Sequence, residues 1–379
     1  MHIKPFLATY PRFDRIPASP DVYCAQAKHA FLEYQHNQWL AQTGQPAIYI
    51  YLIEAHHRRH TGLVALNDVQ DFFVGKVKKH EKTLSEREQH QKELLLRWGA
   101  VLKPILLTFA PVQELKTWME AFIQAHTPLF TVHFKKDGQT HQLWAVEDDT
   151  EIRFLQDLFV RQVPGVYIAD GHHRTSTLAL LHQHLKGEYP HLDFDYLFCA
   201  YFATDQLDIL DYNRVVEGLN GLSPEQLFGR LSQVFEIEYV EYPRKPRKKY
   251  QLKLFFRGHW YRLHWKPEVL TAWRPSAHTL PVLLDVSMLN ELVLRQILGI
   301  RDVRTDARIT YVEGSKGLNG IRKVVGNSAE HTGFVLFPVS FDDMMHIADT
   351  GKSLPPKSTF FEPRMKTGIL IKMLDKEPV

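Results

Sequence analysis

The chain has 379 residues, of which 44% are hydrophobic and 23% are charged, as is typical of a globular protein with a large buried core. The formal net charge of +3 is too small to indicate nucleic-acid binding by itself, and two cysteines exclude a disulfide framework or a cysteine-based zinc site. No apolar run of about 18 residues and no apolar leader are visible, so we expect a cytoplasmic protein without a membrane partner.

The spacing of apolar residues predicts strands and helices that alternate without a regular repeat, which favours an α+β fold. Strands are predicted at 47–55 and 101–110, and helices at 112–126, 150–162, 223–235 and 286–299. A further helix is predicted to end near Leu96, and Thr83 and Glu86 have the spacing of a capping box at its start. Asp137-Gly138 is expected at the turn of a β-hairpin.

Two clusters of basic residues have a simple structural interpretation. The basic block at 242–253 lies between two strand-like runs, and we interpret it as a solvated hairpin loop. His56 and His60 have the i, i+4 spacing of a metal-binding helix, but no carboxylate accompanies them as in a zinc peptidase. We therefore interpret the segment 56–60 as a surface turn.

The segment 164–174, with the sequence PGVYIADGHHR, is the most informative part of the chain. An apolar strand at 166–169 ends abruptly on Asp170-Gly171, and a helical pattern of leucines follows. Amide N–H groups at a helix start attract anions, and the guanidinium of Arg174 can make a bidentate contact with a phosphate. Because packing alone does not require these residue types together, the sequence predicts an anion-binding turn.

This segment resembles the signature of a bacterial family, domain of unknown function family 1015. Segments 71–95, 297–314 and 353–371 resemble three further blocks of that family, in the same order. The resemblance implies an α+β fold of the ParB/sulfiredoxin-like superfamily, with a mixed-sheet core and an elaborated C-terminal α+β extension. The core, with the His-Glu and Asp-Gly-His-His-Arg motifs, is expected at 1–205, and the C-terminal region, packed on the core and contributing to the pocket, at 206–379.

The same resemblance extends to free-serine kinases, in which an early His-Glu faces a later Asp-Gly-His-His-Arg. It implies that Glu81 acts as base toward the substrate hydroxyl, together with His80 and Asp170 as catalytic residues. The residues expected to bind the phosphoryl donor are Lys79, Gly171, His172, His173, Arg174, Lys357, Ser358 and Thr359. Asp170 is also the candidate Mg²⁺ ligand, and Arg214 follows a strand end where it could clamp the carboxylate of an amino-acid substrate.

We therefore expect a small-molecule kinase, a phosphotransferase with an alcohol group as acceptor, acting on free L-serine with Mg²⁺. The donor is ATP, ADP or pyrophosphate; no Walker-type loop is present, and the sequence does not choose among them. The chain has Thr-Ser-Thr at 175–177 where the family has Tyr-Glu-Thr, and Asn213 where it tends to have His. These departures keep open an alternative, a non-catalytic nucleotide-binding regulatory protein.

A third role, in nucleic-acid processing, would rest only on the basic residues at 244–249, and we expect no nucleic-acid partner. The expected partners are a small-molecule substrate and a phosphoryl donor. The sequence leaves the oligomeric state open.

Overall fold

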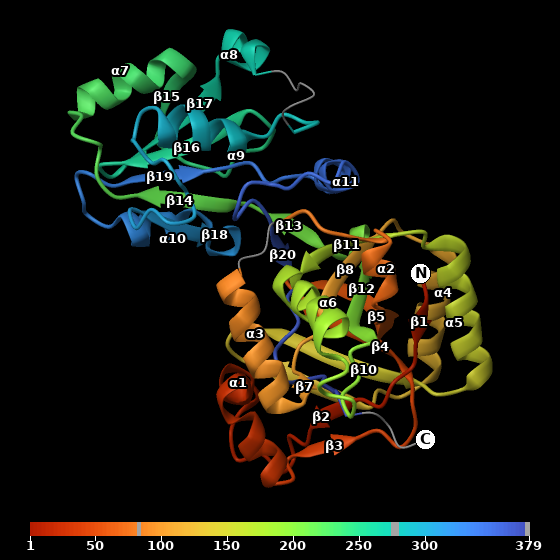
Figure 1. Ribbon diagram of the computed structural model, residues 1–379. Coiled ribbons are helices and arrows are strands. Elements are labelled where there is room, and N and C mark those ends of the chain that lie inside the picture. The colour runs from red at the N-terminus through yellow and green to blue at the C-terminus, as the bar shows by residue number, and fades with distance from the viewer. Residues whose placement is uncertain (82–84, 274–279, 376–379) are drawn as a thin grey trace. The chain divides into compact units, whose positions relative to one another are not determined.

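The computed structural model describes residues 1–81, 85–273 and 280–375. Contacts within the chain divide it into two compact units, which are described separately (Figure 1). The first unit comprises Met1–Asp208 and the chain from Pro363 onward, and the second comprises Ile209–Glu362. The first change of unit lies close to the expected boundary at 205, but the last segment returns to the first unit, whereas the sequence had assigned it to the C-terminal region.

In the described part of the chain, the first unit is built on a mixed sheet of nine strands. Its order is β6 (Val77–Lys78), β11 (Val166–Asp170), β8 (Ile105–Phe109), β12 (Tyr196–Ala203), β5 (Arg58–Asp68), β4 (Ile48–Ala55), β10 (Gln139–Val146) and β9 (Phe130–Phe134), with β1 (Ile3–Lys4) paired to β5. β11 is parallel to β6 and antiparallel to β8, while β12 is parallel to β8. This mixture of strand directions confirms the predicted α+β class with a mixed-sheet core.

Helices accompany this sheet largely where the sequence predicted them. They are α1 (Pro20–His36), α2 (Gln70–Phe73), α3 (Ser85–Trp98), α4 (Gln113–Ala125), α5 (Asp149–Gln162) and α6 (His172–Leu185). The carboxylate of Asp148 begins α5 by accepting the N–H groups of Thr150 and Glu151. Thr83 of the predicted capping box lies outside the described residues. No described helix is both long enough and apolar enough to cross a bilayer.

The predicted strand at 101–110 is interrupted. β7 (Ala100–Val101) pairs with β21 (Lys372–Met373), and β8 begins only at Ile105. The interruption coincides with Pro104, which has no N–H group to donate to a neighbouring strand. The bend places Lys103 and the carbonyl of Pro104 beside the Asp170 turn.

One predicted turn is confirmed in this unit, and a second is shorter than predicted. Asp137 and Gly138 lie between the paired strands β9 and β10, and Gly138 has a φ of 68°. Only His56 and His57 form the turn between β4 and β5, with φ values of 49° and 63°; residues 58–60, predicted as part of the same surface turn, belong to β5, and His60 is buried. A separate pair of short strands, β2 (Thr9–Pro11) and β3 (Leu40–Gln42), flanks α1 in the sequence.

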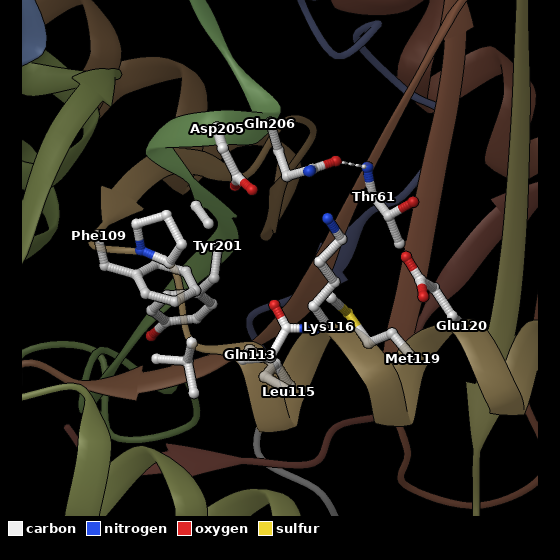
Figure 2. Close-up of a pocket in the computed structure, with 13 residues that line it drawn as sticks. Thr61, Phe109, Gln113, Leu115, Lys116, Met119, Glu120, Tyr201, Asp205 and Gln206 are labelled. Carbon is white, nitrogen blue, oxygen red and sulfur yellow. Dashed lines mark hydrogen bonds between the residues drawn. The ribbon is translucent and has the colours of Figure 1, made fainter.

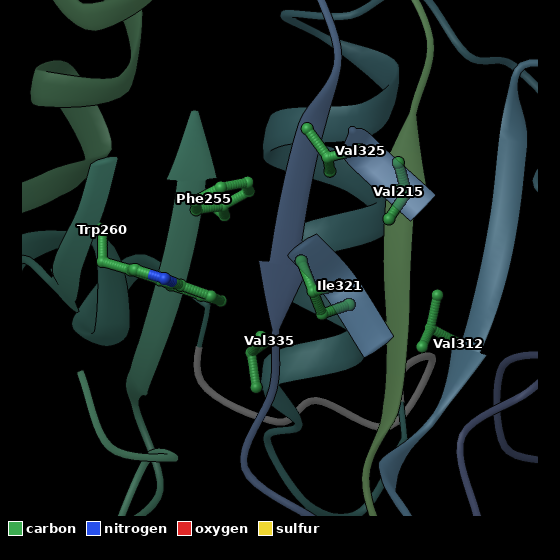
Figure 3. Close-up of a cluster of buried hydrophobic side chains, with 7 residues drawn as sticks. All are labelled: Val215, Phe255, Trp260, Val312, Ile321, Val325 and Val335. Carbon is green, nitrogen blue, oxygen red and sulfur yellow. The ribbon is translucent and has the colours of Figure 1, made fainter. Parts of the chain in front are cut away.

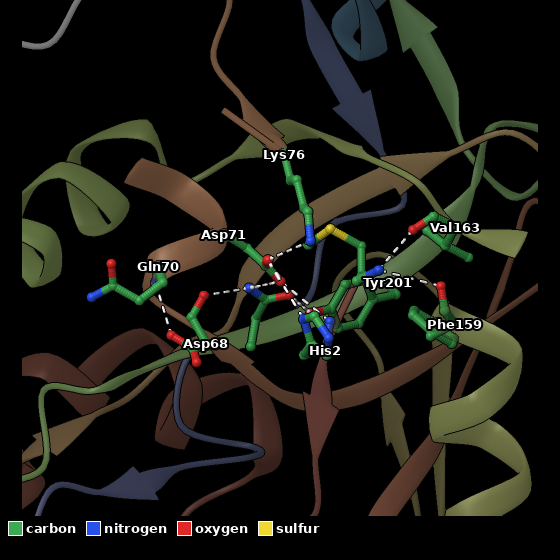
Figure 4. Close-up of polar contacts among 10 residues, drawn as sticks. His2, Asp68, Gln70, Asp71, Lys76, Phe159, Val163 and Tyr201 are labelled. Carbon is green, nitrogen blue, oxygen red and sulfur yellow. Dashed lines mark hydrogen bonds and ion pairs between the residues drawn. The ribbon is translucent and has the colours of Figure 1, made fainter. Parts of the chain in front are cut away.

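A buried carboxylate fixes the approach to β6 (Figure 4). Asp71 of α2 accepts the backbone N–H of His2 at 3.2 Å and pairs with the Lys76 ammonium at 3.3 Å. The backbone N–H of Lys76 also donates to the Asp71 carbonyl at 2.8 Å. These contacts between Asp71 and Lys76 stabilise the turn that precedes β6. β6 leads directly into the His-Glu motif.

The second unit contains a six-stranded antiparallel sheet among its described residues. The order is β15 (Phe235–Val240), β17 (His259–Trp265), β16 (Gln251–Phe256), β19 (Thr332–Val335), β14 (Tyr212–Val216) and β18 (Ile309–Glu313), and β13 (Asp208–Leu210) pairs separately with β20 (Phe360–Glu362). The remaining elements are α7 (Pro224–Val234), α8 (Pro267–Ala272), α9 (Asp285–Met288), the π-helix η2 (Leu289–Arg295), the 3₁₀ turn η3 (Gly314–Lys316), α10 (Gly317–Val325) and α11 (Phe341–Asp349).

The core of this sheet is an apolar cluster between its strands and α10 (Figure 3). Ile321 and Val325 of α10 pack with side chains from four strands, which are Val215, Phe255, Val312 and Val335, and with Trp260 of β17. Each of these side chains is at most 5% exposed, so the cluster stabilises the unit through the hydrophobic effect.

Two predictions for this unit need correction. The basic block is not a hairpin loop, because β15 pairs with β17 and not with β16. Its lysines are also not merely solvated: Lys245 pairs with buried Asp211 at 2.7 Å, and Lys249 pairs with buried Asp343. The helix predicted at 286–299 is divided, since a short α-helix continues as the π-helix η2.

Candidate functional site

The two motifs that are far apart in the sequence leave the sheet side by side. β6 and β11 are parallel neighbours, with Val77 opposite Val166. Because the carboxyl ends of parallel strands meet at one edge of a sheet, the segments after β6 and after β11 emerge together. Two polar contacts join the motifs: the His80 backbone N–H lies 3.5 Å from His172 Nε2, and Glu81 Oε2 lies 3.8 Å from His172 Nδ1. The expected meeting of the two motifs is thus confirmed.

The turn after β11 favours glycine because of its backbone conformation. Gly171 lies between the strand and α6 with a φ of 106°, in the left-handed region that side chains disfavour. A Cβ atom at this position would also lie 2.8 Å from Nη2 of Arg174, the end of a flexible side chain that can shift. The Arg174 side chain therefore folds back over the glycine, and the predicted strand-to-helix turn is confirmed.

Gly171→Ala is expected to lower the free energy of unfolding by about 1–3 kcal/mol, because it adds backbone strain and displaces the Arg174 guanidinium. Denaturant unfolding of the variant measures this loss. Gly187→Ala is the matched control, since a Cβ atom there would meet nothing within 4 Å. Equal stability of the two variants would contradict the role assigned to Gly171.

Among the described residues, three cationic side chains act on the Asp170 carboxylate. Lys103 Nζ and Arg174 Nη2 lie 3.2 Å and 3.0 Å from Asp170 Oδ2, and Arg174 also donates to the Pro104 carbonyl at 3.3 Å. Burial opposes ionisation of Asp170, but the charges of Lys103, Arg174 and Arg364 outweigh it and lower the pKa of this carboxyl. Lys103 and Arg174 contact this carboxylate directly, Arg364 acts on it through its charge, and cations gathered in this way favour an anionic ligand.

Sequence reasoning missed Lys103 and Arg364. Lys103 was read as part of a continuous strand, although a lysine followed by proline within an apolar run is a sign of a bend. Arg364 lies in the C-terminal segment 353–371, where attention fell on Lys357, and it belongs to the first unit. Burial is the main cause that lowers the pKa of Lys103, and the charge of Asp170 opposes this effect.

Two buried histidines, His80 and His172, lie beside Glu81 and contact each other. The His80 and His172 rings meet edge to face with centroids 4.5 Å apart, and the His80 backbone N–H donates to Nε2 of His172 at 3.5 Å. Burial lowers the pKa of His80 to about 4, and burial together with His80 lowers the pKa of His172 well below its usual value. His172 is therefore neutral at physiological pH. Since Nε2 accepts, its proton is assigned to Nδ1, the atom nearest Glu81.

These histidines predict a loss of stability in mild acid. An unfolded histidine takes up a proton below about pH 6.5, whereas folded His80 does so only near pH 4. The unfolded state therefore binds more protons in this window, and each such histidine should cost about 1.4 kcal/mol of stability per pH unit as the pH falls through it. Urea unfolding across this range should show a shallower pH dependence for His80→Gln. An unchanged dependence would contradict the assignment, and exposed His29→Gln is the control.

Thr175, which departs from the family pattern, and Thr177, which matches it, both have structural roles here. The Thr175 hydroxyl donates to the Gly171 carbonyl at 3.1 Å, and the Thr177 hydroxyl donates to the carbonyl of Glu88 in α3 at 3.4 Å. Both threonines are buried, so they hold the start of α6 and join α6 to α3. Of the other predicted donor-binding residues in this unit, His173 is half-buried and Lys79 is exposed.

Four predicted site residues belong to the second unit. Arg214 is fully buried, donates to the Tyr212 and Pro356 carbonyls, and has its guanidinium carbon 5.3 Å from the centre of the Tyr311 ring. Burial lowers its pKa to about 10. The Lys357 ammonium lies 5.2 Å from the centre of the Tyr212 ring.

The other two residues form part of the same segment. The Ser358 hydroxyl donates to the Pro355 carbonyl at 2.6 Å, and Thr359 is half-buried. Nothing in these contacts tests phosphate or substrate binding by Arg214, Lys357, Ser358 or Thr359, and those roles stay predictions.

The residues present do not build a metal site by themselves. Within the described residues, no group of three histidine, cysteine, aspartate or glutamate side chains could hold a metal ion. Asp170 is already surrounded by cations, which repel a divalent ion. Mg²⁺ commonly binds through one or two carboxylates together with substrate phosphates, and only this arrangement suits Asp170.

The fold and the turn together define an α+β protein in which cationic side chains contact the Asp170 carboxylate. Residues 9–287 match the family model described as Protein of unknown function (DUF1015), and the chain belongs to this family. No curated protein sequence matches the chain.

Several solved structures resemble it distantly. SbnI with C-terminal truncation from Staphylococcus aureus has 13% identity and a TM-score of 0.42, covering 81% of this chain and 85% of its own. A mutant of a free serine kinase in complex with ADP has 13% identity and a TM-score of 0.39, covering 82% and 92%. A conserved hypothetical protein from Pyrococcus furiosus has 14% identity and a TM-score of 0.37, covering 82% and 95%.

Proposed function

We propose that this protein is a small-molecule kinase that transfers a phosphoryl group to the hydroxyl of free L-serine. The observation that carries the proposal is the position of Glu81, 3.8 Å from neutral His172 and at the same sheet edge as the Asp170 turn. Phosphoryl transfer needs cations that neutralise the donor phosphates and a carboxylate near the attacking hydroxyl. The motif resemblance to free-serine kinases supports serine as the acceptor.

On the donor side, the cationic cluster would bind the phosphates. Lys103, Arg174 and Arg364 act on one carboxylate, and the phosphate chain of ATP, ADP or pyrophosphate would be attracted by the same cations. The planar fork of Arg174 suits two phosphate oxygens, and the adjacent N–H groups at the start of α6 add donors. Mg²⁺ would enter with the donor and meet Asp170 from the phosphate side.

On the acceptor side, Glu81 would act as the base. Its carboxylate takes the proton of the serine hydroxyl while the hydroxyl oxygen forms a bond to the terminal phosphorus of the donor. The bond from that phosphorus to its bridging oxygen breaks, and the shortened donor leaves with the electron pair. Burial lowers the pKa of His172 well below its usual value, so its ring does not take up the proton at physiological pH. Its Nδ1–H can instead orient the Glu81 carboxylate.

Formation of phosphoserine tests the proposal. The full chain is incubated with L-serine, Mg²⁺ and each of the three donors in turn, and L-alanine, which has no hydroxyl, replaces serine in the control. We expect phosphoserine with one donor and none with alanine. A protein that binds no phosphate donor at all would contradict the proposal.

The alternative function is a non-catalytic nucleotide-binding regulatory protein. The buried hydrogen bond of Thr175 favours it, because this departure from the family pattern serves packing and not chemistry. Donor binding without phosphoserine, in the same experiment, would support this alternative over the kinase.

A further inference from the structure

A separate pocket lies in the first unit, beyond the strand ends opposite to the one where Asp170 lies. β8 and β12 are parallel and end together, with Phe109 opposite Ala203. β11 runs the other way, so Asp170 lies opposite Leu106, near the start of β8. The pocket opens beyond the ends of β8 and β12, between α4 and the 3₁₀ turn η1 (Thr204–Gln206), and it is partly open to solvent.

The floor of this pocket is apolar. Phe109, Leu115, Met119 and Tyr201 line it, and each is at most 7% exposed. The Tyr201 hydroxyl donates to Asn67 at 2.7 Å, so it is already satisfied and the ring offers only apolar surface. A ligand would therefore gain affinity by burying a large apolar group here.

The rim of the pocket carries three exposed charges of both signs. Lys116 and Glu120 come from α4, and Asp205 comes from η1 across the opening. Figure 2 shows the Lys116 ammonium and the Asp205 carboxylate turned toward the same space. Over the described residues, none of the three side chains forms an ion pair, although Lys116 and Glu120 have i, i+4 spacing. The rim thus offers unpaired charges, with one more negative than positive.

The turn that carries Asp205 is held firmly by the start of β5. His60 contacts the Gln206 carbonyl at 2.8 Å, and the Thr61 backbone N–H donates to the Gln206 side chain at 3.0 Å. Arg58 pairs with Asp208 at 2.7 Å and also reaches the Asp205 carbonyl. The histidine- and arginine-rich segment 56–60 therefore anchors this rim. An anchored rim favours binding because the turn loses little conformational entropy when a ligand binds.

We propose that this pocket binds a free α-amino acid with a large apolar side chain. The side chain would cover the floor, the ammonium would meet Asp205 and Glu120, and the carboxylate would meet Lys116. A zwitterion with an apolar body complements all three features, and the negative excess at the rim makes the ammonium the stronger determinant. The pocket is distinct from the proposed serine site, which lies at the other edge of the sheet and uses Glu81.

Calorimetric titration of the full chain with three related compounds tests this assignment. L-Phenylalanine has all the required groups, 2-phenylethylamine lacks the carboxylate, and 3-phenylpropionate lacks the ammonium. We expect phenylalanine to bind most tightly, phenylethylamine about tenfold more weakly, and phenylpropionate weakest, since each charge-assisted contact is worth roughly a factor of ten or more. Equal binding of the three compounds, or no binding of any at millimolar concentration, overturns the proposal.

Variants then locate the binding. Lys116→Ala should lower the affinity for phenylalanine about tenfold, to that of phenylethylamine, and leave the affinity for phenylethylamine unchanged. Asp205→Asn should lower the affinity for both compounds. Exposed Lys28→Ala and Asp157→Asn are the matched controls, and Glu81→Gln should also bind phenylalanine normally. If phenylalanine binding survives Lys116→Ala and Asp205→Asn but is lost in Glu81→Gln, the ligand occupies the other site and this assignment is wrong.

Discussion

Glu81→Gln is expected to lower the rate of phosphoserine formation by about 10²–10⁴-fold while leaving donor affinity largely unchanged. Glutamine keeps the shape of glutamate but cannot accept the proton of the serine hydroxyl. The donor is proposed to be bound by Lys103, Arg174 and Arg364, whose charges the substitution does not alter. The expected pattern is therefore a loss in kcat with calorimetric donor binding preserved.

A matched control for this substitution is Glu188→Gln, which changes an exposed glutamate after α6 and should leave the rate unchanged. Normal turnover by Glu81→Gln would show that Glu81 is structural and that another group acts as base. A parallel loss of donor binding would instead place Glu81 in the donor site.

Arg174→Ala should weaken both donor binding and transfer, each by about 10–100-fold, because a charge-assisted hydrogen bond contributes roughly 1.5–3 kcal/mol. The guanidinium is only partly buried and lies between Asp170 and the Pro104 carbonyl, so its removal also changes how Asp170 is held. Arg174→Lys should recover part of the affinity, since it restores the charge but not the bidentate fork.

The readouts for Arg174 are a donor titration and a phosphoserine assay on the same preparations. Arg153→Ala, an exposed arginine of α5, is the matched control for loss of one positive charge. Unchanged donor affinity in Arg174→Ala would contradict the proposed phosphate site, even if the rate were reduced.

The local sequence pattern around Asp170-Gly171 was sufficient to predict the turn that defines the site. The change from apolar strand to helical periodicity at Asp170-Gly171 needs no knowledge of the rest of the chain, and the turn was confirmed. The approach of Glu81 to His172 depends on β6 and β11 being parallel neighbours, which periodicity does not encode. That approach was predictable only because the family resemblance pairs the two motifs.

Features that depend on tertiary partners were missed. Lys103 joins the site because Pro104 bends the chain between two short strands, and Arg364 joins it because the C-terminal segment returns to the first unit. The basic block was misread for a similar reason. β15 and β16 are consecutive in the sequence, but β17 lies between them, and this pairing order is set by contacts across the whole sheet.

The most direct test of the account is a crystal structure of the Glu81→Gln variant with donor, Mg²⁺ and L-serine, in which the lost base should trap both ligands before transfer. We expect donor phosphates in contact with Arg174 and with Lys103 or Arg364. The serine hydroxyl should lie within about 3 Å of the substituted side chain at position 81. A donor bound away from the Asp170 turn, or a serine hydroxyl pointing away from position 81, would contradict the proposal that these residues form one phosphoryl-transfer site.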